Sequence, residues 1–206
     1  MPMTRFFAVC SFIVLLMAQV VFAGPLEDCQ QFARLGLPSS GNEILCRKGY
    51  LLGHSSERKT PVWVIEHLEH IRINGPVART DDFKPDPDLQ KGSRAELADY
   101  VKSGYQRGHM APADDMSWDE KAMHESFYLS NMVPQNGPMN GGIWRVLEEK
   151  VRKWALDRKS IYVFTGPVYA DNYQTIGENR VAIPEKLFKV VYDPERKEAI
   201  SFIIPQ

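Results

Sequence analysis

The sequence predicts one α+β domain in which helices pack on a β-sheet. Three observations support this: short strand-like segments cluster in two parts of the chain, one long amphipathic helix lies between them, and no repeat or linker divides the 206 residues. Strands, then a helix, then more strands is an order typical of such a sheet domain. The chain is 44% hydrophobic and 25% charged, which indicates a folded protein. Its net charge of −1 excludes a globally basic nucleic-acid binder, so any anion site must be local.

The first 23 residues are expected to be a secretory signal peptide outside the fold. Arg5 precedes an apolar run from Phe6 to Phe22, and Ala23 follows at a position suited to cleavage. An uncleaved membrane anchor is the alternative, because the run is almost long enough to span a bilayer. We therefore expect a single domain over residues 24–206, secreted or periplasmic, with no stable membrane association after cleavage.

Two cysteines remain once Cys10 is removed with this segment. Export and an even count predict a disulfide between Cys29 and Cys46. In the chain-entropy model a loop of this size stabilises the fold by roughly 3 kcal/mol. Two free buried thiols are the alternative, and neither a CxxC motif nor a zinc spacing is present.

The elements before the long helix are short. Residues 49–56 and 60–68 predict two strands around the turn-prone SSERKT, and the proline-rich residues 74–93 predict a surface loop. Residues 95–104 predict a short helix or turn that ends at Gly104, followed by a strand over 106–112 that stops at Pro112. Residues 119–135 predict a helical turn and then a strand over 127–134.

Residues 136–160 contain the clearest helix. Asn140 is expected to be its N-cap. Helical spacing predicts an apolar stripe made of Ile143, Leu147, Val151 and Trp154. It also predicts two i,i+4 pairs of opposite charge, Glu148 with Arg152 and Glu149 with Lys153. Residues 160–169, 181–193 and 199–206 predict the last strands.

Two clusters could carry chemistry. In the segment QRGHMAP, Arg107 and His109 project to the same face of a strand, which places a phosphate-binding cation beside a base that works near neutral pH. The second cluster has three asparagines ahead of the helix. They suit turns and caps, but an amide oxygen such as that of Asn140 also suits a hard divalent cation.

Together these clusters resemble a known family. RGHMAPADDM, FYLSNMVPQNGPMNGGIWRVLEEKVRKWA and VFTGPVY are similar to motifs of the DNA/RNA non-specific endonucleases of the secreted bacterial and mitochondrial endonuclease G type. The resemblance runs from about Gly49 to the C-terminus. It implies a ββα-metal (His-Me finger) nuclease fold, with a central antiparallel sheet and helices packed on it.

The resemblance also implies roles for matching residues. His109 looks like the general base and Asn140 like the single protein ligand for Mg²⁺, with Mn²⁺ as a substitute ion. Glu148 looks like the residue that orients the metal's waters, and Arg107 and Arg152 like phosphate clamps. Arg79 matches a further substrate-binding arginine, although its loop aligns loosely, and Asn131 matches an asparagine that supports the substrate site.

Two departures from the family are visible. The common motif is D-R-G-H, whereas Gln106 stands before Arg107 here and contributes no charge. The sequence also stops directly after a strand, where members usually continue, so a shortened or truncated C-terminal end is expected.

The resulting hypothesis is a metal-dependent hydrolase, an endonuclease that cleaves phosphodiester bonds in DNA and RNA without sequence specificity. A catalytically weakened nucleic-acid-binding member and a small-substrate metal phosphodiesterase are the alternatives. A histidine metal site built from His67 and His70 is a further, weaker one. DNA and RNA are the expected partners, and a homodimer is left open.

Overall fold

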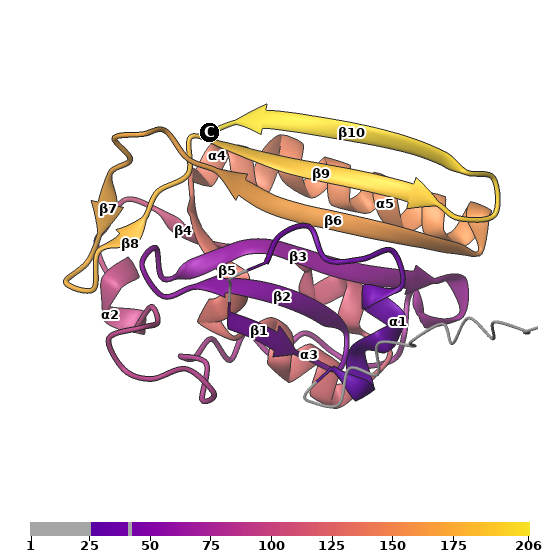
Figure 1. The fold of residues 1–206 in the computed structure, drawn as a ribbon, viewed down its shortest axis with the longest axis horizontal. Helices are drawn as coiled ribbons and strands as arrows, with labels where there is room; N and C mark the ends of the chain where they lie inside the picture. The colour runs from indigo at the N-terminus through magenta and orange to yellow at the C-terminus, as the bar shows by residue number, and fades with distance from the viewer. Residues whose placement is uncertain (1–25, 41–42) are drawn as a thin grey trace, which may run out of the picture.

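A six-stranded antiparallel sheet with the strand order β1-β2-β3-β6-β9-β10 is the largest element of the computed structural model, which describes residues 26–40 and 43–206. The signal-peptide prediction thus falls on residues outside the described ones. The strands of this sheet are β1 (Glu43–Cys46), β2 (Tyr50–Ser55), β3 (Thr60–Glu69), β6 (Ser160–Val168), β9 (Lys186–Asp193) and β10 (Glu198–Pro205). Figure 1 shows α5 lying behind β6 and β9, so helix and sheet form two layers.

Two small hairpins and several short helices complete the described part of the chain. The hairpins pair β4 (Gln106–His109) with β5 (Met132–Gln135), and β7 (Thr175–Ile176) with β8 (Val181–Ala182). The α-helices are α1 (Gln30–Ala33), α2 (Leu97–Tyr100), α3 (Glu120–Ser126), α4 (Gly137–Met139) and α5 (Arg145–Arg158). Between them lie the 3-10 turns η1 (Glu27–Cys29), η2 (His70–Arg72), η3 (Ala113–Met116) and η4 (Leu129–Asn131) and the π-helical turn η5 (Asn140–Trp144).

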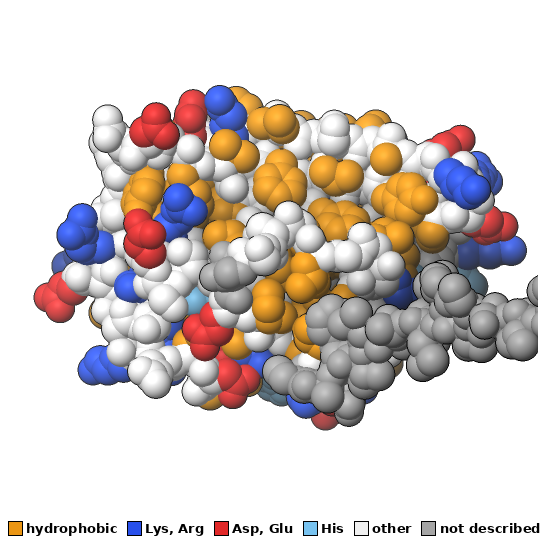
Figure 2. All heavy atoms as spheres, viewed as in Figure 1, with side chains coloured by type: hydrophobic (Ala, Val, Ile, Leu, Met, Phe, Trp, Pro, Cys, Tyr) orange, Lys and Arg blue, Asp and Glu red, His pale blue; other side chains and the backbone are white. Residues whose placement is uncertain are grey.

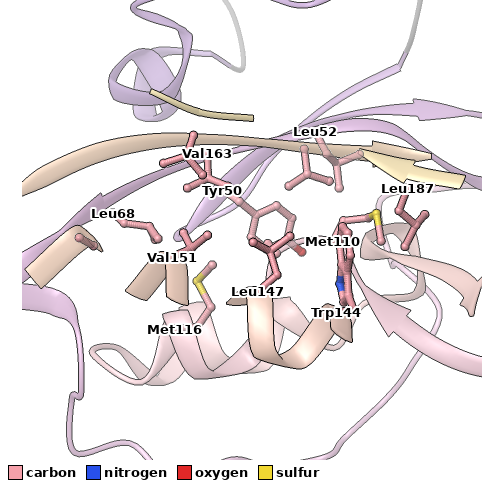
Figure 3. Close-up of a cluster of buried hydrophobic side chains, with 14 of the residues drawn as sticks. Tyr50, Leu52, Leu68, Met110, Met116, Trp144, Leu147, Val151, Val163 and Leu187 are labelled. Atoms are coloured by element: carbon pink, nitrogen blue, oxygen red, sulfur yellow. The ribbon is translucent and has the colours of Figure 1, made fainter. Parts of the chain in front are cut away.

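Alternation along the strands divides the apolar side chains between the two faces of the sheet. Leu52, Val163 and Leu187 point toward α5, where they meet Trp144 and Leu147, and Figure 3 shows these side chains facing one another between the layers. The opposite face packs against α1 through another buried cluster: Cys29, Phe32, Leu51, Trp63, Ile65 and Tyr162. Figure 2 looks onto this second face and shows hydrophobic side chains gathered over the sheet.

The predicted disulfide is confirmed. Cys29 and Cys46 are bonded, with 5.8 Å between their Cα atoms, and the bond joins the segment that leads into α1 to the edge strand β1. It therefore fastens α1 to the sheet face that α5 does not cover. The α+β class and the central antiparallel sheet predicted from sequence are confirmed as well.

Two details of the sequence prediction around Asn131 and Asn140 are wrong. Residues 127–131 do not form a strand, because Asn131 lies in the 3-10 turn η4 and β5 begins only at Met132. Asn140 is not a helix N-cap. Asn136 has that role, since its side chain accepts a hydrogen bond from the Met139 amide at 3.4 Å.

The helix stripe and its charge pairs also differ from expectation. Ile143 is 55% exposed, and Trp144 is buried instead, because Trp144 lies three residues before Leu147 and this spacing also places it on the buried face of the helix. Glu149 pairs with Arg145 rather than with Lys153.

No helix in the described ranges is both long enough and apolar enough to cross a bilayer.

Leu187 provides a test of the packing between sheet and helix. It is fully buried on β9, so we expect Leu187→Ala to lower the free energy of unfolding by about 2–5 kcal/mol. Ile203→Ala on the adjacent strand β10 is the matched control. Because Ile203 is 66% exposed, its loss should change stability by no more than about 0.5 kcal/mol. Urea unfolding followed by circular dichroism measures both, and equal effects would contradict this account of the core.

Candidate active site

Five of the site residues predicted from the sequence line one cleft of about 580 Å³. The β4–β5 hairpin, the start of the long helix and the loop over residues 79–83 each contribute to its walls. Among the predicted residues, those that line it are Arg79, Arg107, His109, Asn140 and Glu148. The structure thus brings together five predicted side chains that are separated by up to 69 positions in the sequence.

His109 ends β4 and sits between aromatic rings. The ring of Phe127 meets its imidazole edge-on at 5.1 Å, and Phe83 is tilted at 5.7 Å. Its Nε2 atom is buried and has no hydrogen-bond partner among the described residues. Burial, with the positive charges of Arg79 and Arg107, lowers the pKa of His109 to about 3. The imidazole is therefore neutral at physiological pH and able to accept a proton.

The backbone of β4 comes unusually close to a side chain of β5. A Cβ atom on Gly108 would lie 1.9 Å from Oε1 of Gln135, which is fully buried beneath it. Only glycine fits at this crossing, so Gly108 allows Arg107 and His109 to sit on a strand that packs tightly on its partner.

Arg79 and Arg107 bring positive charge to the imidazole from two directions. The guanidinium of Arg107 lies over the Phe83 ring at 4.1 Å, and that of Arg79 lies over the Phe127 ring at 4.9 Å. Arg79 also bonds the exposed carboxylate of Asp81 at 2.7 Å. Stacking restricts both planar groups while leaving hydrogen-bond donors for an anion.

Asn140 begins the π-helical turn η5 at the rim of the cleft. Its Nδ2 donates to Oε1 of Gln106 at 2.9 Å, and no described residue bonds its Oδ1. Gln106 thereby fixes the amide orientation, with the carbonyl oxygen left available as a ligand. Gln106, the residue that departs from the family motif, is consequently a direct neighbour of the predicted metal ligand.

Glu148 lies two helical turns further along, partly buried at the floor of the cleft. Burial raises the pKa of its carboxyl to about 7, and Asp115 acts in the same direction, while the cation of Lys189 opposes the rise. Lys189 is itself buried: its Nζ donates to Thr165 Oγ1 at 2.7 Å and lies 4.9 Å from the centre of the Trp144 ring.

Arg152 and Asn131 do not line the cleft. The guanidinium of Arg152 bonds Asp115 at 2.9 Å and approaches Asp114 at 3.4 Å. Arg152 therefore forms ion pairs with these two carboxylates and not with Glu148, the partner predicted from the sequence. Asn131 is fully buried, and its amide bonds the amide and carbonyl of Ala111 and the carbonyl of Ser126, all at 2.9 Å. Its direct contacts are therefore with backbone two residues beyond His109.

The oxygen atoms of the cleft suit a hard divalent cation better than a soft one. Asn140 offers a carbonyl oxygen and Glu148 a carboxylate, which are ligand types that Mg²⁺ accepts alongside several waters. Within the described ranges no group of three or more His, Cys, Asp or Glu side chains could hold a metal. His67 instead bonds Ser160 at 2.7 Å and stacks on Tyr162. These contacts argue against the metal site of His67 and His70 that the sequence left open.

Sequence reasoning missed several residues of this cleft. Phe83 and Phe127 enclose the imidazole, and Arg145 adds a further cation to the lining. Aromatic residues in a loop and a turn carry no periodic signal, so only the fold brings them to His109. Arg145 could have been predicted as a cleft residue from the sequence, because it lies between Asn140 and Glu148 on the same helical segment.

Comparison with known proteins agrees with this geometry. The family model for DNA/RNA non-specific endonucleases matches residues 29–206. The chain is 40% identical to the mitochondrial nuclease EXOG of Danio rerio over 189 residues, which is 84% of this chain and 55% of that protein. It is 37% identical to human mitochondrial endonuclease G over 172 residues, 78% of this chain and 58% of that protein. The chain thus spans a little over half the length of these relatives.

A solved structure shares the fold. The chain superposes on a crystal structure of an EndoG/EndoGI complex with a TM-score of 0.82 and 33% identity, over 88% of this chain and 81% of that one. Sequence and structure therefore lead to the same conclusion: the chain belongs to the DNA/RNA non-specific endonuclease family.

Proposed function

We propose that the protein is a metal-dependent endonuclease that hydrolyses phosphodiester bonds in DNA and RNA without sequence specificity. The observation that carries the proposal is the convergence of a neutral imidazole, two arginines and two oxygen ligands on one cleft. We further propose that it acts outside the cytoplasm, as its N-terminal sequence suggests. The relatives described above carry the word mitochondrial in their names, so the compartment itself needs a direct test.

His109 takes the proton from the attacking water in this mechanism. A general base of this kind contributes roughly 10²- to 10⁴-fold to the rate. In the free protein its pKa is low, partly because two guanidinium groups face it. A bound phosphate neutralises these cations, which raises the pKa of His109 when substrate is present.

Arg79 and Arg107 hold the phosphate and stabilise the charge that develops on its oxygens. Arg152 contributes indirectly, through the ion pair that orients Asp115 beside Glu148. None of these groups is placed to read a base edge, so binding through the backbone is sequence-independent and weakens as salt rises.

Asn140 and Glu148 would hold Mg²⁺ and its waters. When bound there, Mg²⁺, or Mn²⁺ in its place, would supply Lewis-acid stabilisation of the leaving oxygen. Gln106 keeps the Asn140 carbonyl oxygen turned toward this position, and Glu148 accepts hydrogen bonds from water when its carboxylate is ionised.

A cleavage assay tests the proposal. Plasmid DNA and RNA are incubated with purified protein in Mg²⁺ or in EDTA, and we expect cleavage of both substrates in Mg²⁺ alone. His109→Ala should lower the rate by about 10²-fold or more, because the general base is lost. His70→Ala, at an exposed histidine outside the cleft, is the matched control. Cleavage that persists in EDTA, or a His109→Ala variant as active as wild type, would refute the mechanism.

Gln106 allows a test of the neutral residue beside Asn140. In Gln106→Asp, a carboxylate replaces the acceptor of the Asn140 amide and adds a negative charge near the proposed metal position. Because this charge attracts the cation, half-maximal activity should need several-fold less Mg²⁺. Gln106→Met removes the acceptor and should raise that concentration. Mg²⁺ titration of the cleavage rate measures both, and identical midpoints for all three proteins would show that the hydrogen bond has no effect on the metal.

Glu148 predicts a pH-dependent stability in metal-free protein. Its folded-state pKa is about 7, against an ordinary value of 4.5, so the folded protein holds an extra proton between these values. The stability that this carboxyl contributes is present below pH 4.5 and lost as the pH rises through 7. Relative to wild type, Glu148→Gln should therefore gain roughly 1–3 kcal/mol of unfolding free energy between pH 5 and 8.

Urea unfolding in EDTA at the two pH values measures this difference. Comparing variant with wild type isolates Glu148 from His109, whose lowered pKa makes stability rise with pH between about 3 and 6.5. Glu149→Gln, on the same helix and paired with Arg145, is the control. A Glu148→Gln curve parallel to that of wild type would contradict the raised pKa.

A further inference from the structure

Apolar and aromatic side chains form one wall of the cleft, beside its arginines and polar groups. This α2 wall consists of Leu97, Tyr100, Val101 and Tyr105, from α2 and the turn that follows it. Val101 is 68% exposed and Leu97 is 39% exposed. Scattered exposed apolar side chains are ordinary, but here they gather inside the candidate active site, where a ligand rather than water would cover them.

The α2 wall is held rigidly from behind. Asp99 is buried and accepts hydrogen bonds from the Glu96 amide at 2.8 Å and the Asn179 amide at 3.1 Å. A Cβ atom on Gly177 would lie 2.2 Å from Asp99, so the loop that supports α2 fits closely against it. The wall is therefore a preformed surface, which binds without a large cost of ordering.

The wall is continuous with the phosphate-binding residues. Tyr105 directly precedes Gln106 and Arg107 in the chain, and the charge of Arg107 acts on the Tyr100 hydroxyl. In a nucleic-acid strand each phosphate carries a sugar and a base on either side of it. An apolar surface beside a phosphate clamp therefore fits the base and sugar of the same strand.

We propose that the α2 wall is a nucleoside subsite, which binds the base and sugar next to the phosphate held by Arg107. The proposal deepens the nuclease function proposed above and rests on it. Apolar and aromatic surfaces bind every base through its face, so this subsite preserves sequence independence. It favours unpaired strands, because a base paired and stacked in a duplex does not present its face.

Short single-stranded oligonucleotides test the subsite. Each has one ordinary phosphodiester bond between uncleavable methylphosphonate linkages, and one base is replaced by a stable abasic residue at successive positions. With wild-type protein in Mg²⁺, we expect base removal at one position beside the cleavable bond to lower kcat/KM by about 5- to 100-fold. Base removal at distant positions should have no effect.

Variants connect this loss to the wall. Leu97→Ser combined with Val101→Ser should lower kcat/KM on the intact oligonucleotide by a similar factor and abolish the effect of base removal. Ile71→Ser, at a side chain that is 75% exposed and outside the cleft, should behave as wild type.

Each outcome has a distinct meaning. Equal cleavage of intact and abasic substrates by wild type would overturn the subsite and leave the nuclease function standing. A double variant that keeps the sensitivity to base removal would overturn it as well. Absence of any Mg²⁺-dependent cleavage by wild type would overturn both proposals.

Discussion

The side-chain amide of Asn131 holds together the part of the structure on which the candidate site depends. Buried completely, it bonds both the amide and the carbonyl of Ala111 and the carbonyl of Ser126, and the backbone carbonyl of Asn131 accepts from the Met110 amide at 3.0 Å. These bonds fix the chain just after His109 against the start of β5. Each hydrogen bond contributes about 1 kcal/mol, but losing the amide would leave several buried backbone groups without partners, which costs more. The imidazole is thus positioned by backbone geometry and by two aromatic rings.

Local sequence patterns predicted the strands well where apolar residues run almost continuously through strands that are buried on both faces, as in β2, β3 and β6. They failed where a few side-chain contacts decide the backbone. Residues 127–131 have strand-like composition, but the bonds of Asn131 and the packing of Phe127 on His109 hold them in turns. At the long helix, asparagines at 136 and 140 both look like caps, and only the tertiary structure leaves Asn140 free to face the cleft. The buried face of the helix begins at Trp144 rather than at Ile143, and both positions have helical spacing to Leu147, so periodicity alone could not choose between them.

The burial of charged residues beneath the cleft could not be predicted from the sequence either. Glu66 and Lys189 lie on different strands with nothing in their local sequence to mark them, yet both are buried under η5 and α5. Burial and the nearby carboxylates of Asp115 and Glu148 raise the pKa of Glu66. Burying several charges is unfavourable unless they compensate one another, so a cluster of this kind is weak evidence for a stability role. The cluster lies between the sheet and the helix that bears Glu148, so its charges act on the pKa of the Glu148 carboxyl in the cleft.

The disulfide and the cleft belong to opposite sides of the sheet. Cys29 and Cys46 fasten α1 over Leu51, Ile65 and Tyr162, whereas the cleft residues are supported by the layer that contains α5. Cells that move such a domain between an oxidising and a reducing compartment would therefore change the attachment of its N-terminal segment without directly altering a catalytic contact.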